Sequence, residues 1–483
     1  MHKVVRSFLP FPALLAAFLA FSHAGDEKPP RPYEPRVAPA SKEALAAMKR
    51  LRLPKGLAVD LYAAEPLLAN PVCFCFDEKG RCYVAETFRL HAGVTDNRGH
   101  MNWLDDDLAA RSVADRLALY RKFLRDRVKD YEKEHDRVRL LLDTDGDSKP
   151  DKAVVFADGF HRAEDGIGAG LLARKGKVYY TCIPDLWRLQ DTDGDGKVDI
   201  RESLSTGYGV HVSFIGHDMH GLRLGPDGKL YFSIGDRGLN VRTKEGKRLF
   251  HPDTGAVLRC DLDGANLEVV ATGLRNPQEL AFDDFGNLFT VDNNSDSGDQ
   301  ARLVYVVEGG ESGWHIGYQY GSRIHDERSR MGNRGPWNYE KLWHLKHDGQ
   351  PAYIVPPLAH IAAGPSGLCH YPGIGLGERY AGHFFLCDFR GEAGGSGVWS
   401  FAVKPKGAAF EIADAHQFVW SVLATDCGFG PDGAFYISDW VQGWDLTGKG
   451  RIWKVTDPDN IKKPAVAEAK KLLAEGFDHR KTE

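Results

Sequence analysis

The sequence lacks four features that would point to particular classes of protein. It has no excess of positive charge, since 62 lysines and arginines stand against 67 aspartates and glutamates. It also has no basic stripe interleaved with aromatic residues, so we expect no nucleic-acid partner. It has no Cys-x-x-Cys-His motif, which excludes a covalently attached c-type haem. Beyond the N-terminal segment it has no apolar run long enough to cross a bilayer. Small molecules and metal ions remain as candidate partners.

The N-terminal segment has the pattern of a secretory signal. A basic start precedes an apolar stretch over 8–21 and a small residue at Ala24. This pattern predicts a signal peptide over 1–24, followed by a linker with a short helix over 25–50. The apolar stretch is too short to span a membrane, and an N-terminal anchor that is never cleaved is the alternative. We therefore expect a secreted or periplasmic protein with no membrane span after cleavage.

All eight cysteines follow that segment, and export permits disulfides. Cys73, Cys75 and Cys82 lie in VCFCFDEKGRCYVAE, a pattern typical of a β-hairpin across which Cys75 and Cys82 could pair. These are positions where strands favour small apolar residues, so buried free thiols are the favoured interpretation.

Short strand pairs around a glycine turn recur along the chain. They read CFCFDEKGRCYVAE, GLLARKGKVYYTC, LRLGPDGKLYFSIGD, LAFDDFGNLFTVD, GERYAGHFFLCDF and CGFGPDGAFYISD, with turn glycines at Gly80, Gly176, Gly228, Gly286, Gly382 and Gly433. Apart from two wider gaps that hold insertions, the spacing is that of four-stranded propeller blades, roughly 40 to 50 residues. Six such hairpins predict an all-β, six-bladed β-propeller over residues 51–456.

Other segments complete this architecture. More polar strand pairs such as AVLRCDLDGANLEVVATG fit the outer strands of the blades. GLAVDLYAAEP at 56–66 can pair with the last blade near GRIWKVTD, which would remove the open edge of the ring. Residues 103–135 have apolar residues at helical spacing after an acidic start, which predicts a helical insertion in the first blade. Residues 457–483 predict a short helical C-terminal tail.

Polar residues recur just before the inner strands of four blades. They are Asp165 in the second, His217, Asp218 and His220 in the third, Arg275, Asn276 and Gln278 in the fourth, and Asp426 in the sixth. Equivalent loops of a propeller converge at one end of its axis, so we expect a central pocket there. A histidine in it can accept a proton from a bound hydroxyl, and an arginine can stabilise developing negative charge. The alternative is that His217 and His220 only hydrogen-bond the loop of a neighbouring blade.

Two acidic loops have the spacing of calcium sites. DTDGDGKVDIRE over 191–202 matches the twelve-residue calcium loop throughout, with ligand positions at Asp191, Asp193, Asp195, Lys197 (through its carbonyl), Asp199 and Glu202. DTDGDSKPDKA over 143–153 repeats the opening with Asp143, Asp145, Asp147 and Asp151. It has Ser148 in place of the glycine and no acid at the twelfth position. The flanking strands predict a calcium-stapled hairpin, and an acidic solvated turn is the alternative in both loops.

Longer motifs carry a resemblance to known families. HDMHGLRLGPDGKLYFSIGD and GLRNPQELAFDDFGNLFTVDNNSDSGDQARLVYVVEGGESGWHIGY make the chain similar to the soluble quinoprotein glucose and sorbosone dehydrogenases. With VTDNRGHMNWLDDDLAARSVADRLALYRKF and the paired DTDGD loops, it resembles more closely the secreted "membrane-bound dehydrogenase" propeller proteins of planctomycetes, over roughly residues 50–483. The resemblance implies a carbohydrate or polyol substrate, pyrroloquinoline quinone and calcium as cofactors, and an external electron acceptor.

The resemblance also implies roles for single residues. Together with the recurring polar positions, it assigns His217, His220 and Arg275 to catalysis, with His217 the better match to the general base, and Asp218, Asn276, Gln278, Arg390 and Asp426 to cofactor binding. The run 293–296 falls where the quinoprotein family holds calcium through backbone carbonyls. The arginines that bind the quinone's carboxylates in that family have no counterpart in SVLATDCGF, and Arg390 is the nearest substitute for its lysine. A tricarboxylate binds weakly without such cations.

These observations together predict a sugar or polyol dehydrogenase of quinoprotein type. Two alternatives remain open. The first is a non-catalytic propeller that binds carbohydrate or another protein. The second is a calcium-dependent hydrolase of lactones or phosphoesters, which needs Asp165, Asp218 and Asp426 to converge in the central channel.

Overall fold

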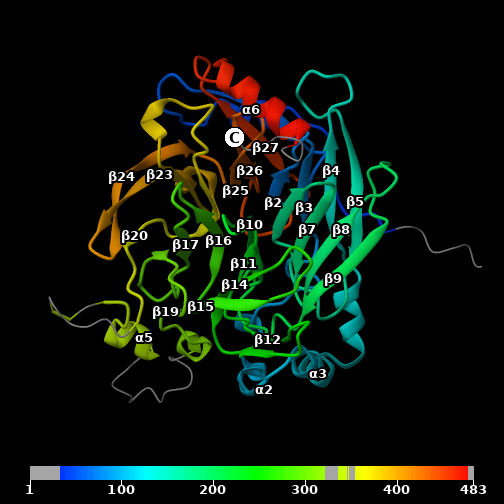
Figure 1. Ribbon diagram of the computed structural model, residues 1–483. Helices are drawn as coiled ribbons and strands as arrows, with labels where there is room; N and C mark the ends of the chain where they lie inside the picture. The colour runs from blue at the N-terminus through cyan, green and yellow to red at the C-terminus, as the bar shows by residue number, and fades with distance from the viewer. Residues whose placement is uncertain (1–32, 321–334, 345, 348–353, 477–483) are drawn as a thin grey trace, which may run out of the picture. The chain divides into compact units, whose positions relative to one another are not determined.

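The computed structural model describes residues 33–320, 335–344, 346–347 and 354–476. The chain divides into residues 1–34 and 35–483, and the propeller lies within the second part. The predicted signal peptide lies outside the described residues. The architecture is all-β, with six blades around a central axis (Figure 1).

Each blade is built on four antiparallel strands, which follow one another from the axis outward. Blade 1 contains β2 (Pro71–Phe76), β3 (Cys82–Glu86), β4 (Asp136–Leu142) and β5 (Lys152–Phe160). Blade 2 contains β6 (Gly170–Arg174), β7 (Lys177–Cys182), β8 (Asp185–Gln190) and β9 (Ile200–Thr206). Blade 3 contains β10 (Met219–Leu224), β11 (Leu230–Ile234), β14 (Gly255–Cys260) and β15 (Glu268–Leu274), with β19 (Gly310–Glu311) added in parallel at the edge. A separate hairpin pairs β12 (Leu239–Arg242) with β13 (Arg248–His251).

The remaining blades follow the same order. Blade 4 contains β16 (Pro277–Phe282), β17 (Leu288–Asp292), β18 (Arg302–Tyr305) and β20 (Ala359–His360). Blade 5 contains β21 (Pro365–His370), β22 (His383–Asp388), β23 (Gly397–Lys406) and β24 (Ala409–Trp420). Blade 6 contains β25 (Ala424–Phe429), β26 (Phe435–Asp439), β27 (Arg451–Thr456) and β1 (Ala58–Ala64). The second strand of each blade is the most buried, and β3, β11, β17, β22 and β26 contain only buried residues.

Five of the six inner hairpins have the predicted glycine turn, with left-handed backbone at Gly80, Gly176, Gly228, Gly286 and Gly433. The fifth blade differs. Its strand β21 begins well before the predicted hairpin, and the connection to β22 contains a 3-10 helix, η6 (Glu378–Tyr380). Gly382 ends this longer connection and does not form a tight turn, because the extra residues after His370 separate the two strands.

The ring closes as predicted. Strand β1, the first strand of the described chain, pairs antiparallel with β27. Ala58 lies opposite Thr456 at one end of the pair and Ala64 opposite Arg451 at the other. β1 is therefore the outermost strand of blade 6. Glu43 in α1 (Glu43–Met48) adds an ion pair, with Oε1 at 3.0 Å from Arg451 Nη2.

The helical insertion lies between β3 and β4 of blade 1, as predicted. It comprises η1 (Asn97–Gly99), η2 (Met101–Trp103), α2 (Leu104–Ala109), α3 (Val113–Leu124) and η3 (Arg125–Glu132). Ser112 caps α3 by accepting a hydrogen bond from the Asp115 backbone at 3.2 Å, which satisfies a free amide at the helix start. Trp103, Leu119, Tyr120 and Leu124 are buried together with Val212 of blade 3's entry loop.

Short helices complete the described chain: η4 (Ile316–Tyr320), α5 (Gly335–Glu340), η7 (Ala393–Gly395) and α6 (Pro464–Glu475). α6 is the predicted helical tail, and Val466 anchors it against Gly433. Among the described residues, no helix has the length and apolarity needed to cross a membrane. All eight cysteines are free, including Cys75 and Cys82, and seven of them are buried.

Candidate active site

A cavity of about 470 Å³ lies at one end of the propeller axis. It is formed by the starts of the innermost strands and by the loops that follow the second strands, which is where loop positions of the blades converge. Six sequence-predicted residues line it: His217, Asp218, His220, Arg275, Asn276 and Gln278. Arg98, Asp296, Phe389, Trp440 and Trp444 also line it.

His217 has the geometry of an oriented base. Its Nδ1 lies 2.7 Å from Asp236 Oδ1, and both side chains are buried. Asp236 also accepts hydrogen bonds from Ser213 Oγ at 2.6 Å and Trp314 Nε1 at 2.9 Å. Because the carboxylate only accepts, Nδ1 carries the proton and Nε2 is left with its lone pair. Nε2 has no hydrogen-bond partner among the described residues.

Asp236 is held as an anion. Burial acts to raise its pKa, but the neighbouring His217 and Arg275 and the hydrogen bonds it accepts lower the pKa to about 2. Sequence reasoning missed this residue, although it ends the motif FSIGD. The available signal is a nearby recurrence: Glu86, Asp292, Asp388 and Asp439 end the second strands of four other blades, whereas Asp236 lies two residues beyond the end of β11 at Ile234.

The other four acids accept hydrogen bonds from backbone amides, whereas Asp236 accepts them from side chains. Asp292 accepts from the backbone amides of Arg275 and Asn276, at 3.0 and 2.7 Å, and Glu86 accepts from that of Ala69 at 2.7 Å. In blade 3 the carboxylate of Asp236, two residues beyond the strand end, is bound to a histidine side chain that lines the cavity.

His220, Asn276 and Gln278 converge on one backbone carbonyl. His220 Nε2, Asn276 Nδ2 and Gln278 Nε2 lie 3.0, 3.2 and 3.4 Å from the carbonyl oxygen of Gly216. Burial lowers the pKa of His220 to about 4, so this imidazole is neutral and donates from Nε2. These three side chains therefore fix the loop that carries His217, and the geometry favours His217 over His220 as the base.

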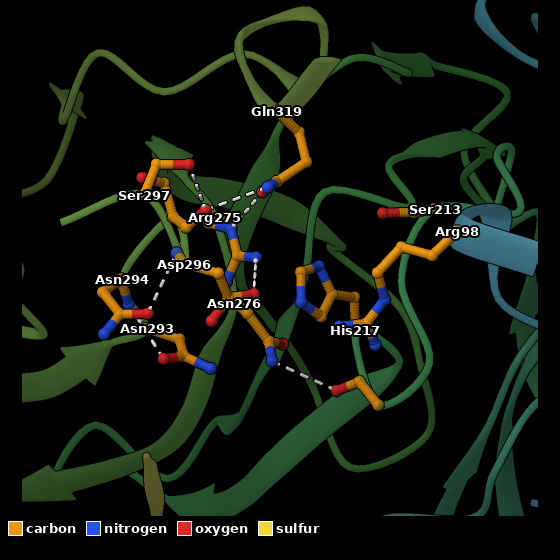
Figure 2. A network of polar contacts seen from close by, with 12 residues as sticks. Arg98, Ser213, His217, Arg275, Asn276, Asn293, Asn294, Asp296, Ser297 and Gln319 are labelled. Carbon is orange, nitrogen blue, oxygen red and sulfur yellow. Dashed lines mark hydrogen bonds and ion pairs between the residues drawn. The ribbon is translucent and has the colours of Figure 1, made fainter. Parts of the chain in front are cut away.

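Arg275 is buried at the wall of the cavity and has one free donor. Its Nε donates to Gln319 Oε1 at 2.8 Å, and Nη2 lies 3.2 Å from Asp296 Oδ2 (Figure 2). Nη1 has no hydrogen-bond partner among the described residues, and neither has Asn276 Oδ1. A donor and an acceptor are thus left for a ligand beside His217.

Asp218 lines the cavity, and its carboxylate forms an ion pair with the buried Arg237. Its Oδ1 is 3.5 Å from Nη1 of Arg237, and both side chains are fully buried. Neither Asp218 oxygen has a hydrogen bond from a described residue. The two buried charges balance each other, which buried ions require.

The prediction that Asp426 faces the cavity is wrong. β25 has a bulge between Ala424 and Asp426, so Thr425 lies at the cavity instead. Asp426 accepts a hydrogen bond from the Phe74 backbone at 3.0 Å and is fully buried, and burial raises its pKa.

Arg390 and Asp165 also lie away from the cavity. The Arg390 guanidinium, which was predicted to bind the cofactor, instead donates from Nη2 to the Asp388 carboxylate at 2.6 Å. The neighbouring Phe389 lines the cavity. Asp165 accepts from the backbone and Nε of Arg162, at 2.9 and 2.7 Å. Of the three carboxylates that a hydrolase would need in the channel, Asp218 lines the cavity, and Asp165 and Asp426 do not.

The helical insertion supports the loop that carries His217. His211 Nδ1 lies 2.6 Å from the Asp107 carbonyl, and the Asp107 carboxylate accepts from the Val212 backbone at 2.7 Å. The insertion also supplies Arg98, whose guanidinium lies 4.4 Å from the Phe214 ring centroid and whose side chain lies next to His217 in Figure 2. It is thus a structural part of the cavity.

The two acidic loops have matching conformations. Both connect the third and fourth strands of a blade, in blades 1 and 2. Asp143 accepts from the amides of Gly146 and Ser148 at 2.7 and 2.9 Å, as does Asp191 from Gly194 and Gly196. Ser148 takes the left-handed backbone that glycine has in the other loop, with φ of 69° against 85° for Gly196.

In each loop the first three aspartates gather their oxygens. Carboxylate oxygens of Asp143, Asp145 and Asp147 lie within 4.8 Å of one another, and so do those of Asp191, Asp193 and Asp195. The other predicted ligands are turned elsewhere. Asp151 and Asp199 accept from the backbones of Thr144 and Thr192, at 2.9 and 2.6 Å. Glu202 lies in β9 and pairs with Arg188 of β8, so its role as the twelfth ligand stays a prediction.

Comparisons with known proteins agree with this fold. The chain belongs to the protein family described as "Domain of unknown function (DUF7133)", whose model matches residues 43–444. It is also similar to quinoprotein glucose dehydrogenase B of Acinetobacter calcoaceticus, with 31% identity over 124 residues. That match spans 20% of this chain and about a quarter, 26%, of the relative.

Solved structures share the propeller over most of the chain. An oxidoreductase (glucose dehydrogenase) from Thermus thermophilus covers 83% of this chain and 99% of its own, with a TM-score of 0.51 and 17% identity. A family AA12 protein of the carbohydrate-active enzymes from Trichoderma reesei covers 84% and 97%, with a TM-score of 0.50 and 12% identity. The predicted resemblance to quinoprotein glucose dehydrogenases is confirmed, and that to planctomycete propeller proteins stays a prediction.

Proposed function

We propose that this protein is an oxidoreductase of the quinoprotein sugar-dehydrogenase type that removes a proton and a hydride from a carbohydrate or polyol hydroxyl in the axial cavity. The observation that carries this proposal is the His217–Asp236 pair, buried and 2.7 Å apart, in a cavity of substrate size. Asp236 keeps the proton on Nδ1, so Nε2 can accept the proton of a substrate hydroxyl. The similarity to quinoprotein glucose dehydrogenase B supports the same chemistry.

Arg275 and Asn276 fit the two sides of this reaction. The free Nη1 donor of Arg275 stabilises the negative charge that develops on oxygen as the proton leaves. The free Oδ1 of Asn276 accepts a hydrogen bond from a ligand hydroxyl or amine. Because both side chains are buried, their unmade hydrogen bonds are costly until a ligand binds.

The hydride needs an acceptor, and a bound quinone would supply one. The donor set suits an anionic quinone in part: Arg275 Nη1 and Arg98 face the cavity, and they are the cationic arginine side chains among its described lining residues. Arg98, whose Nη2 lies 2.7 Å from Asp96 Oδ2, would hold an anionic group of pyrroloquinoline quinone, and Arg275 Nη1 would be left for the substrate oxygen. Reoxidation of the quinone would then need an external electron acceptor.

The acidic loops are proposed calcium sites of structural type. Each offers three converging aspartates on a tight loop, and hard cations such as calcium prefer that oxygen-rich donor set. Both loops lie in outer hairpins of blades 1 and 2, away from His217, so calcium there would stabilise the blades. The predicted export of the protein would place it where calcium is abundant.

The test is titration of the purified protein with pyrroloquinoline quinone in the presence of calcium, followed by dye reduction with a panel of aldoses and polyols. We expect saturable quinone binding and turnover by the wild type. His217→Gln should bind quinone but lose turnover per folded molecule, while its circular dichroism spectrum shows the same fold. Absence of quinone binding, or full turnover by His217→Gln, contradicts the proposal.

A further inference from the structure

The part of the axial cavity that blades 5 and 6 line is aromatic. Phe389 follows β22 of blade 5, and Trp440 and Trp444 follow β26 of blade 6. Of the described residues that line the cavity from these two blades, none is charged. A ligand on this wall is therefore recognised through apolar faces and neutral hydrogen bonds.

Trp444 is exposed and yet held in one position. Its side chain has 62% of its area exposed, although large aromatic side chains are usually buried in a soluble protein. Its ring packs edge-on against Phe389, with centroids 4.8 Å apart. The indole also lies against the backbone of Gly391, where a Cβ would meet Nε1 at 2.2 Å. Well over half of this residue therefore stays accessible at the cavity.

Trp440 supplies a hydrogen-bond donor at the same wall. It is only 6% exposed, and its Nε1 has no hydrogen-bond partner among the described residues. A buried indole N–H normally finds a partner. The loop between the two tryptophans is strained at Val441, a β-branched residue with φ of 78° whose amide is held by Asp439 Oδ1 at 2.9 Å. Such strain is uncommon in β-branched residues, and it persists where the surrounding structure enforces it.

We propose that Trp440 and Trp444 form a subsite for a second sugar ring, so that the ligand of the cavity is the end of a neutral oligosaccharide. A pyranose ring has an apolar C–H face that stacks on an open indole and hydroxyls that accept from an indole N–H. The ring bound there lies beyond the one that reaches His217. This inference rests on the proposed function only in taking the ligand to be a sugar, and it adds the size and charge of that ligand.

The test measures binding without turnover. Labelled wild-type protein is applied to an array of neutral oligosaccharides, and hits are titrated by calorimetry beside the corresponding monosaccharide. We expect at least one oligosaccharide series to bind about tenfold more tightly than its monosaccharide, and Trp444→Ala to remove that difference. Trp444→Phe should keep part of it. Trp440→Phe, which keeps the ring and removes the N–H, should weaken binding by a smaller factor.

A matched control and the two failure modes complete the design. Phe285→Ala removes another exposed aromatic side chain, 90% exposed in the β16–β17 turn, and should leave binding unchanged. Absence of oligosaccharide binding by the wild type, or equal binding by Trp444→Ala, overturns the subsite. If oligosaccharides bind through Trp444 but no quinone-dependent turnover occurs, the subsite stands and the proposed dehydrogenase fails. If monosaccharides are oxidised and Trp444→Ala leaves oligosaccharide binding unchanged, the proposed dehydrogenase stands and the subsite fails.

Discussion

Replacement of Asp236 by Asn separates the structural and chemical roles of this carboxylate. The wild-type side chain receives three hydrogen bonds, from His217, Ser213 and Trp314. An amide has a single oxygen and brings two N–H donors, so at least one of the three buried donors loses its acceptor. The amide can also donate to His217 Nδ1, which moves the imidazole proton to Nε2 and removes the base.

The magnitude follows from the pKa. Asp236 is fully buried, and its pKa falls from 3.8 to about 2 on folding. Since a tenfold change in proton affinity is worth about 1.4 kcal/mol, the folded state gains about 2.5 kcal/mol from the ionised carboxylate. A group with a lowered pKa contributes this stability above pH 4 and loses it as the pH falls through 2. The Asn variant lacks both the stability and its loss in acid.

The assay is urea unfolding at pH 7 and at several values between pH 4 and pH 2, together with turnover at pH 7. We expect Asp236→Asn to be about 2.5 kcal/mol less stable at pH 7 and to show a flatter acid limb. Its turnover per folded molecule should fall by about 10²-fold or more, the usual contribution of a positioned base. Glu86→Gln, which changes a buried carboxylate at the end of the second strand of blade 1, should leave turnover per folded molecule within about twofold. An equal loss of unfolding free energy between pH 4 and pH 2 in the wild type and in Asp236→Asn would refute this reasoning.

Two further predictions concern stability. Burial acts to lower the pKa of His211, but its hydrogen bonds to Asp107 and Asp253 raise the pKa to about 9. The protonated imidazole therefore stabilises the insertion below pH 6.5. This contribution is lost as the pH rises through 9. Urea unfolding at pH 6.5 and 9.5 should show a loss on the order of 3 kcal/mol that His211→Gln lacks; equal losses would contradict the ion pair. Calcium at 100 times the Kd of a loop should raise the unfolding free energy by about 2.7 kcal/mol for each loop that it occupies. In calorimetric scans, Asp145→Asn combined with Asp193→Asn should abolish that increase, whereas an increase that survives in this variant would place the calcium elsewhere.

The features predicted well from the sequence are those that repeat. Glycine turns and alternating strands recur in each blade, so the propeller, the closure by β1 and the clustering of His217 with Arg275 follow from the repeat itself. Asp236 was missed because its contact with His217 depends on the pairing of β10 with β11, which brings residues 19 positions apart together. Asp426 was misplaced because a bulge shifts the alternation by one residue.

Other errors came from competition between side chains. Arg390 and Glu202 have the right charges for the roles predicted for them, but Asp388 and Arg188 lie closer in the fold and bind them first. Trp440 and Trp444 lie in a loop without periodicity, where sequence alone does not show which side chains reach the axis.

The pairing of β1 with β27 also determines when the propeller can be completed during synthesis. The two strands are separated by nearly the whole ring, from Ala64 to Arg451. The antiparallel strands of each of blades 1 to 5 follow one another along the chain and can form before β27 is synthesised. Blade 6 must wait for β27, and until then β1 presents an open edge that other chains can bind. We therefore expect the nascent protein to depend most on chaperones during the last step of its translation.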